Sequence, residues 1–286
     1  MKLVDRVWHA ARPFVPIRGY PALAPLHRWR RRLRLDRLAQ DDVRYHNAHP
    51  GLIAPPADLR YNVVGPCTIP EFLASGDQAV RDIEQALRSV GRSLEAASTF
   101  LDFGCGCGRV LLSLERRDTV ASFIGCDVDA RSVEWCRQNL RRSRCFVNDP
   151  LPPLPVEEGS VDLIWCGSVF THLDEDRQDR WLKELHRILT PNGILLASVH
   201  GTAAWESRLA PRTIATLKRR GMMFARYDTD IEVRPRWYQV AWHTEDYVRA
   251  RWGTIFHVAA YLPRGLQGYQ DLIVAEKLPG SGRDPL

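Results

Sequence analysis

The sequence predicts an α/β fold in which a doubly wound, mostly parallel sheet of seven strands carries helices on both faces. Five short apolar runs recur between residues 99 and 199, and segments with helical spacing separate several of them. A glycine-rich turn directly follows the first run, and two further strand-like runs come near the end of the chain. Strands that alternate with helices pair in parallel, because each helix carries the chain back to the edge where the previous strand began.

Apolar runs bounded by turn residues locate the strands, and apolar stripes at helical spacing locate the helices. The parallel strands are predicted at 99–103, 121–126, 144–147, 161–166 and 193–199. Helices are predicted near 77–91, 108–117, 129–141 and 174–189. The last two strands, 254–262 and 271–277, are joined by a short loop and therefore suit an antiparallel pair at the edge of the sheet.

Two regions lie outside this alternation. In the first 60 residues only 22–40 has helical character, and the stretch from Pro50 to Pro70 carries five prolines and is interpreted as an extended connector. Residues 201–253 form an insertion before the final strand pair, with a helix expected over 203–220. The predicted divisions are a basic N-terminal extension at 1–76, a main domain at 77–278 and a flexible tail at 279–286.

Composition and charge exclude several classes of protein. Of 286 residues, 45% are apolar and 26% are charged, which is typical of a globular chain with a buried core. The net charge of +6 is uneven, because residues 1–60 hold 12 basic and 5 acidic residues and the remainder holds 28 and 29. The basic character therefore belongs to the N-terminal extension, and the nearly neutral main domain favours a small ligand.

The sequence shows no sign of export. No run approaches the roughly 18 apolar residues that a membrane-spanning helix needs. The start, MKLVDRVWHAARPF, places charges and a proline where a signal peptide has an apolar stretch. Seven cysteines without a CxxC pair fit neither a disulfide framework nor a zinc ribbon. We therefore expect a reducing, cytoplasmic setting.

The turn after the first strand carries the chemistry. Three glycines stand there at alternate positions, namely Gly104, Gly106 and Gly108. Glycine permits the tight turn and lets backbone N–H groups approach a ligand closely. The spacing is not the dinucleotide fingerprint, because Arg109 occupies its third glycine position. Asp127 follows the second strand, 21 residues past Gly106, where an acid can bind both hydroxyls of a ribose.

Taken in order, the motifs resemble the class I S-adenosylmethionine-dependent methyltransferases, over about residues 77–200 and with the final strand pair to 277. The matching segments are Asp102-x-Gly104-x-Gly106-x-Gly108, Gly125-Cys126-Asp127, Asn148-Asp149, Ser160 to Ile164, Phe170 to Leu173 and Leu182 to Gly193. Asn192 stands where the family usually has a second glycine, and asparagine also tolerates a left-handed turn. The resemblance implies a Rossmann-like fold with S-adenosyl-L-methionine as the methyl donor.

The resemblance also implies which residues contact the methyl donor. The acid at 127 would bind the ribose, the polar pair after the third strand would face the adenine, and the segment 170–173 would line the methionine end. The implied set is Asp102, Gly104, Cys105, Gly106, Gly108, Asp127, Val128, Asn148, Asp149, Ser168 and His172. No acid follows the fourth strand, where a catechol-type magnesium site would need one, so no metal is expected.

Methyl transfer to a hydroxyl needs alignment and a nearby base, and histidine is the natural base near neutral pH. His200 ends the fifth strand and is a candidate that points toward the acceptor. His172 follows the fourth strand and is either a base or a residue that touches the donor and orders its loop. His243, in the insertion, is either a base or only the neighbour of a helix N-cap.

Two further features have two interpretations each, and a third carries a resemblance of its own. The aromatic residues of the segment 236–242 form either a wall against a ring-shaped substrate or part of the core. Cys105 and Cys107 are interpreted as small residues between glycines and not as a reactive thiol pair. Gln270-Asp271 resembles bacterial methyltransferases that act on glycosylated or secondary-metabolite substrates.

The sequence thus predicts a methyltransferase whose N-terminal extension is a lid over the active site. The expected reaction is O-methylation of a small-molecule or glycosidic acceptor, by direct in-line transfer with a histidine base, without nucleic acid or membrane as partner. One alternative is an RNA methyltransferase that uses the arginine-rich extension, although leucines interrupt those arginines. Others are a non-catalytic interaction protein that keeps the fold, and an extension that lies on a membrane surface.

Overall fold

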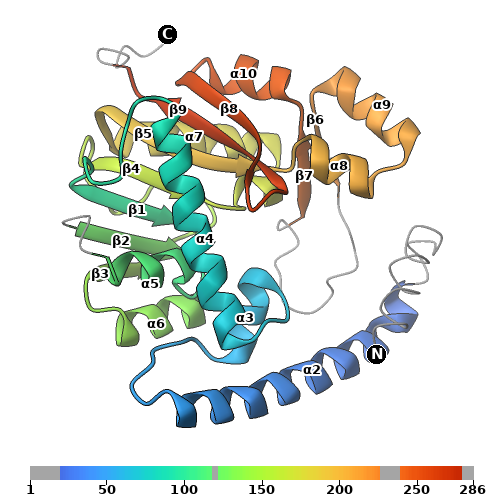
Figure 1. Ribbon diagram of the computed structural model, residues 1–286. Helices are drawn as coiled ribbons and strands as arrows, with labels where there is room; N and C mark the ends of the chain where they lie inside the picture. Colours follow the sequence, from blue (N-terminus) through green and yellow to red (C-terminus); the bar gives the residue numbers. More distant parts are fainter. Residues whose placement is uncertain (1–19, 118–121, 226–238, 279–286) are drawn as a thin grey trace.

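A computed structural model describes residues 20–117, 122–225 and 239–278 of the chain, with side chains from residue 28 onward (Figure 1). Its centre is a seven-stranded sheet with the order β3-β2-β1-β4-β5-β9-β8. The strands are β1 Thr99–Phe103, β2 Ser122–Asp127, β3 Ser143–Val147, β4 Val161–Cys166, β5 Leu189–Val199, β8 His257–Leu266 and β9 Gln270–Glu276. β1 to β5 pair in parallel and β9 is antiparallel to both of its neighbours, which confirms the predicted fold class.

Helices cover both faces of the sheet, because successive strand residues point to opposite sides. Phe100 of β1 packs into one apolar cluster, with helices α4, α5 and α6. Leu101, the next residue, packs into the cluster on the other face, with α7 and α10. These helices are α4 Ile69–Arg88, α5 Arg109–Glu115, α6 Ala130–Asn139, α7 Glu175–Ile188 and α10 Glu245–Trp252.

The segment between Pro50 and Pro70 is not the extended connector that its prolines predict. Helix α3, Ala57–Val64, lies within it, and α4 begins at Ile69, eight residues before the predicted start. Thr68 and Glu71 form a reciprocal capping box at the start of α4. Proline is compatible with the first turn of a helix, where its missing N–H has no partner to lose, so these prolines precede or begin helices.

The insertion contains two helices and a small second sheet in place of one long helix. The predicted helix over 203–220 is divided into α8, Thr202–Arg208, and α9, Pro211–Arg220. Proline at 211 disfavours helical backbone at the residue before it, so α8 ends and α9 starts anew. Strands β6, Met222–Ala225, and β7, Val240–His243, pair antiparallel beside the main sheet.

The aromatic segment of the insertion is described only in part. Trp242 is buried with Trp205 and Leu217 in a small apolar cluster, which agrees with the core interpretation for that residue. Trp237 and Tyr238 lie outside the described residues, as does the predicted tail 279–286.

Helix α2, Tyr20–Ala48, is longer than the predicted 22–40 and runs along one side of the molecule, where it contacts α3 (Figure 1). Its anchor is an ion pair between Asp42 and Arg60 of α3, with Nη2–Oδ1 at 2.7 Å and an Arg60 side chain that is 0% exposed. Arg31 adds a hydrogen bond to Asn62 at 3.1 Å and lies 5.0 Å from the centre of the Tyr61 ring.

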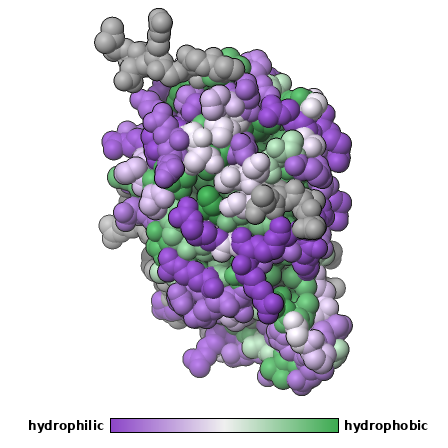
Figure 2. Space-filling model, turned by 90° about the vertical axis from the view of Figure 1, so that its left-hand side faces the viewer, coloured by the Kyte–Doolittle hydropathy of each residue, from purple (hydrophilic) through white to green (hydrophobic). Residues whose placement is uncertain are grey.

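The surface of the molecule is mixed. Figure 2 shows a face on which hydrophilic residues predominate, with apolar patches between them. In the part of the chain that the structure describes, no helix combines the length and the apolar character needed to cross a bilayer.

We expect Asp42→Asn to lower the free energy of unfolding by about 3 kcal/mol, because Arg60 would keep a buried charge without its counter-ion. The neighbouring Asp41 supplies a matched control, since its pair with Arg44 is 3.6 Å long and both side chains are exposed, at 54% and 79%. Asp41→Asn should cost less than about 0.5 kcal/mol. Urea unfolding followed by tryptophan fluorescence measures both, and equal midpoints for the two variants would contradict this account of the anchor.

Candidate active site

The carboxyl ends of the parallel strands bring distant residues to one edge of the sheet. The glycine-rich turn follows β1 and Asp127 ends β2. Asn148, Ser168 and His200 come directly or shortly after β3, β4 and β5. Because β9 is antiparallel to β5, its first residue, Gln270, reaches the same edge. The strand order therefore assembles the sequence-predicted residues along one edge, with Asn148 at one end, the glycine turn in the middle and His200 toward the other end.

The glycine turn has no room for side chains at two of its positions. Gly104 and Gly106 have φ angles of +80° and +53°, a region that L side chains rarely adopt. A Cβ at Gly104 would lie 2.3 Å from Val169, and one at Gly106 would lie 2.6 Å from Val63 of α3. The N-terminal extension therefore packs directly onto the turn through Val63. No sequence motif predicts this contact.

Three backbone N–H groups of the turn bond within the protein, although the glycine spacing predicts N–H groups that approach a ligand. Gly104 and Cys105 both donate to the carbonyl of Cys126, at 2.8 and 3.0 Å. Gly106 donates to the carboxylate of Asp127 at 2.8 Å. The end of β2 thus shapes the turn before any ligand arrives.

Two carboxyl groups lie beside this turn in an environment that resists negative charge. Burial raises the pKa of Asp102 to about 7, with Arg109 opposing the shift and Asp127 adding to it. Burial also raises the pKa of Asp127, against hydrogen bonds from the amides of Asp129 and Gly106. A cationic ligand would stabilise both carboxyl groups in their charged form, whereas an anionic pyrophosphate would be repelled by them.

The outer rim of this region is polar and partly exposed. The side-chain amide of Asn148 donates to the carbonyl of Asp149 at 2.7 Å, and the Asn148 backbone donates to the Asp127 carbonyl at 3.1 Å. Val128 and Asp149 are exposed next to it. The thiols of Cys105 and Cys107 are buried, and burial raises the pKa of Cys107, which suits their interpretation as packing residues.

A network of three side chains holds the loop after β4. Ser168 has a left-handed backbone, φ +63°, and its N–H donates to the hydroxyl of Ser198 at 2.8 Å. Ser198 donates to Gln270 at 2.7 Å, and Gln270 donates back to Ser168 at 2.8 Å. Sequence reasoning missed Ser198 and this network, because the partners lie up to 102 residues apart and share no local pattern.

His200 is nearly buried and held in one tautomer. Its Nδ1 lies 3.1 Å from the carbonyl of Ala241, which can only accept, so Nδ1 carries the proton and Nε2 keeps its lone pair. Burial lowers the pKa of His200 to about 4, and the charge of Arg208 contributes. The ring is therefore neutral over the physiological range.

His172 and Tyr269 flank His200. The His172 Nδ1 lies 2.7 Å from the carbonyl of Gln239, which assigns it the same tautomer. The ring centres of His172 and Tyr269 lie 6.3 and 6.2 Å from that of His200, both edge-on. Tyr269 belongs to the turn before β9 and was not among the residues that the motifs pointed to.

The structure places His243 in the core, where it cannot reach an acceptor. Its side chain is 0% exposed, and its Nε2 lies 3.1 Å from Oε1 of Gln178. The Gln178 amide nitrogen already donates to the carbonyls of Phe170 and Leu173, so the proton between the two residues belongs to His243. Of the three candidate bases, His243 is therefore the one that we do not carry into the proposed mechanism.

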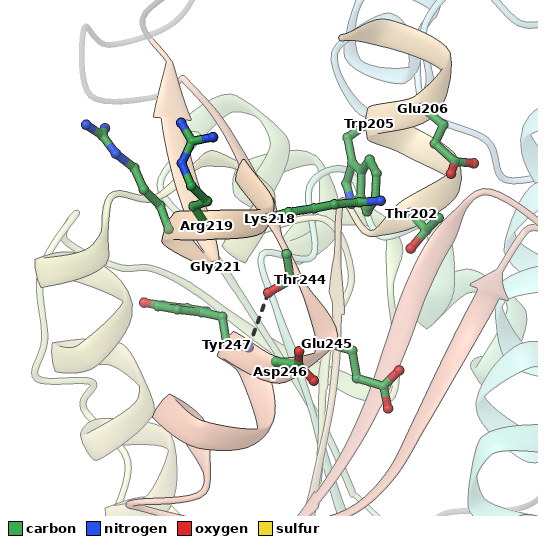
Figure 3. A pocket seen from close by; sticks show the side chains of 11 residues that line it. Thr202, Trp205, Glu206, Lys218, Arg219, Gly221, Thr244, Glu245, Asp246 and Tyr247 are labelled. Atoms are coloured by element: carbon green, nitrogen blue, oxygen red, sulfur yellow. Dashed lines mark hydrogen bonds between the residues drawn. The ribbon is translucent and has the colours of Figure 1, made fainter. Parts of the chain in front are cut away.

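A hollow of about 660 Å³ lies on the insertion, between α8, the end of α9 and the start of α10 (Figure 3). Its lining mixes charges: Lys218 and Arg219 come from α9, Lys218 extends toward Trp205, and Glu245 and Asp246 come from the start of α10. None of the residues that the motifs predicted line this pocket. Within the described ranges, no group of three or more histidine, cysteine or acidic side chains is placed to hold a metal ion.

Comparisons with known proteins agree with this geometry. Residues 101–197 match a family model described as a methyltransferase domain. The tRNA N(3)-methylcytidine methyltransferase Mettl2 of Drosophila melanogaster is 31% identical over 117 residues, 38% of this chain and 36% of that protein. The human tRNA N(3)-cytidine methyltransferase METTL6 is 28% identical over 139 residues, 46% of this chain and 48% of that protein. The chain thus spans about half or less of the length of these relatives.

One solved structure covers most of the chain. Phosphoethanolamine N-methyltransferase 1 of Haemonchus contortus superimposes with a TM-score of 0.55 at 16% identity, over 88% of this chain and 51% of that chain. This likeness concerns the fold alone. The matched family model describes residues 101–197 as a methyltransferase domain, and these residues hold β2, β3, β4 and most of β1 and β5 of the central sheet.

The buried His243 makes stability depend on pH. Burial, with a contribution from His200, lowers its pKa to about 3 from 6.5, so between these values only the unfolded chain binds the proton. The free energy of unfolding should fall as the pH falls, by at most about 1.4 kcal/mol per unit for one histidine. We expect a shallower decline between about pH 6 and 4 for His243→Gln in urea unfolding. The exposed His257 supplies the control, and parallel slopes for wild type and His243→Gln would refute the assignment.

Proposed function

We propose that the protein transfers the methyl group of S-adenosyl-L-methionine to an acceptor bound beside β4, β5 and β9. The observation that carries this proposal is the pair of crowded acids at the glycine turn, Asp102 and Asp127, both with raised pKa. A sulfonium cation fits that environment. When bound, the donor supplies a methyl group that is already activated by its positive sulfur.

In this proposal the residues at the ends of β1 to β4 hold the donor. Asp127 binds the ribose hydroxyls, since a carboxylate that accepts two amide bonds, from Gly106 and Asp129, still has free lone pairs. Val128, Asn148 and Asp149 form the adenine end. The turn residues Asp102, Gly104, Cys105, Gly106 and Gly108, with Ser168 and His172, enclose the methionine end.

His200 acts as the base in this mechanism. Its Nδ1–H is held by the Ala241 carbonyl, so Nε2 is the free acceptor for the proton of an acceptor hydroxyl. The ring stays neutral at physiological pH and does not have to lose a proton first. His172 lies beside it and orders the same loop. We propose O-methylation of a small or glycosidic acceptor on this basis, in keeping with the nearly neutral main domain.

An RNA acceptor is the second candidate, and a specific observation favours it. Two of the matched relatives are named as tRNA methyltransferases, so the comparisons do not support excluding nucleic acid as a partner. Helix α2 is one continuous basic helix anchored next to the glycine turn through α3. This candidate requires RNA to bind along α2 with an affinity that falls steeply as salt increases.

Asp127→Ala should weaken the binding of S-adenosylhomocysteine at least about a hundredfold, because two charge-assisted hydrogen bonds to the ribose would be lost. Calorimetric titration measures the affinity, and thermal unfolding shows whether the variant folds. Asp176→Ala removes an exposed carboxylate from α7 and should bind normally. If Asp127→Ala folds and binds within a few-fold of wild type, the ribose assignment is refuted.

His200→Ala should lower the rate of methyl transfer about a hundredfold or more while leaving the affinity for S-adenosylhomocysteine unchanged. The exposed His257→Ala is the control. Because the pKa of His200 is lowered to about 4, its protonation should add no acidic limb near 6.5 to the rate at saturating donor, and its contribution should be lost only as the pH approaches 4. An unchanged rate in His200→Ala would remove this residue as the base.

A further inference from the structure

Arg208 ends helix α8, eight residues after His200, and returns to the same corner of the sheet edge. Its guanidinium carbon lies 5.3 Å from the centre of the Tyr269 ring, and that ring lies edge-on to His200. Its positive charge is also one cause of the lowered pKa of His200. A cation, a phenol and a neutral imidazole therefore meet at the end of β5.

Two of these groups, the Tyr269 hydroxyl and the Arg208 guanidinium, have no hydrogen-bond or ion-pair partner among the residues that the structure describes. The hydroxyl of Tyr269 is buried and makes no hydrogen bond within the structure as described. Buried hydroxyls in folded proteins are nearly always bonded, so an unpaired one next to an exposed cation is a candidate donor for a ligand. Arg208 is exposed and has no ion pair with any residue in the described ranges, where other surface arginines do have one.

Neighbouring acids do not neutralise Arg208. Glu206 lies two positions away on α8, a spacing at which helical side chains do not face each other. Its side chain lines the hollow on the insertion, together with Glu245 and Asp246 (Figure 3). The buried Asp271, at the start of β9, is bonded instead by the Tyr261 hydroxyl and by the backbone N–H groups of Arg264 and Thr202, so it forms no ion pair with Arg208.

We propose that the methyl acceptor is a small molecule with an oxyanion, a carboxylate or a phosphate monoester, which Arg208 and the hydroxyl of Tyr269 bind. The inference rests on the proposed methyltransferase function and specifies the substrate class of that site. Arg208 donates N–H groups to the anion and Tyr269 donates its O–H. The anion is held next to His200, so the acceptor hydroxyl lies beside the free Nε2. Transfer breaks the methyl–sulfur bond, forms the methyl–oxygen bond, and moves the hydroxyl proton to Nε2.

The acceptor class can be tested without knowing the acceptor. A small-molecule cell extract is separated on an anion exchanger, and each fraction, and purified RNA, is offered to the full chain with tritiated S-adenosylmethionine. We expect label in the anionic small-molecule fractions, with Arg208→Gln lowering it about tenfold or more and Arg208→Lys restoring most of it. Arg212→Gln, which removes an equal charge from an exposed site on α9, should label as wild type does.

The outcomes separate the two levels of the proposal. Label in neutral or cationic fractions, or in RNA alone, overturns the oxyanion inference and leaves a methyltransferase. No label in any fraction, with S-adenosylhomocysteine still bound, contradicts the proposed function and the inference together. Phosphatase treatment of the active fraction removes its activity if the anion is a phosphate monoester and spares it if the anion is a carboxylate.

Tyr269→Phe tests whether the Tyr269 hydroxyl binds the acceptor. A hydroxyl with only a structural role would change the stability of the protein and not KM. A hydroxyl without a partner adds no hydrogen bond to the folded chain, so thermal unfolding should be unchanged while KM for the active fraction rises about five- to tenfold. Tyr247→Phe is the matched control, because the Tyr247 hydroxyl donates to Glu175 at 2.8 Å. That variant should lose stability and keep its KM. A Tyr269→Phe protein with lower stability and unchanged KM would overturn the inference.

Discussion

The bond between the Asp127 carboxylate and the N–H of Gly106 is the contact on which the rest of the site depends. It joins the end of β2 to the turn after β1 at 2.8 Å, while the other oxygen accepts from Asp129 at the start of α6. The Asp127 side chain therefore joins the glycine turn, the end of β2 and the start of α6. Because Gly106 lies directly under Val63, the same bond also fixes where α3 rests.

The side chains along the sheet edge differ in kind from one end to the other. Near β1 and β2 two carboxyl groups crowd together, and burial raises the pKa of each. Near β5 and β9 a neutral histidine, a phenol and an arginine meet, while the buried Asp271 carboxylate accepts from the Tyr261 hydroxyl. In the proposed function this difference lets a cationic donor and an anionic acceptor bind side by side, with His200 between them. Transfer between them then needs alignment more than strong acid–base chemistry.

The N-terminal extension is tied to this site through buried contacts and not through a hinge. Arg60 of α3 is enclosed by Asp42 and by the backbone carbonyls of Pro55 and Cys67. An extension that is rich in arginine and proline has few apolar residues to mark its packing face, so its helices α2 and α3 were misjudged in length or missed. Its buried anchor is a charged residue, which hydrophobic periodicity does not detect.

The sequence by itself determined the seven-stranded fold, the glycine turn and the acid at the end of β2, because short-range spacing and strand–helix alternation encode these features locally. It also placed His172 and His200 at the correct edge. Only the tertiary structure decided that His243 is enclosed by Gln178, that Ser168, Ser198 and Gln270 form one network, and that Arg208 and Tyr269 meet beside His200. Those contacts join residues that are tens of positions apart, so their geometry exists only once the sheet and the insertion have packed.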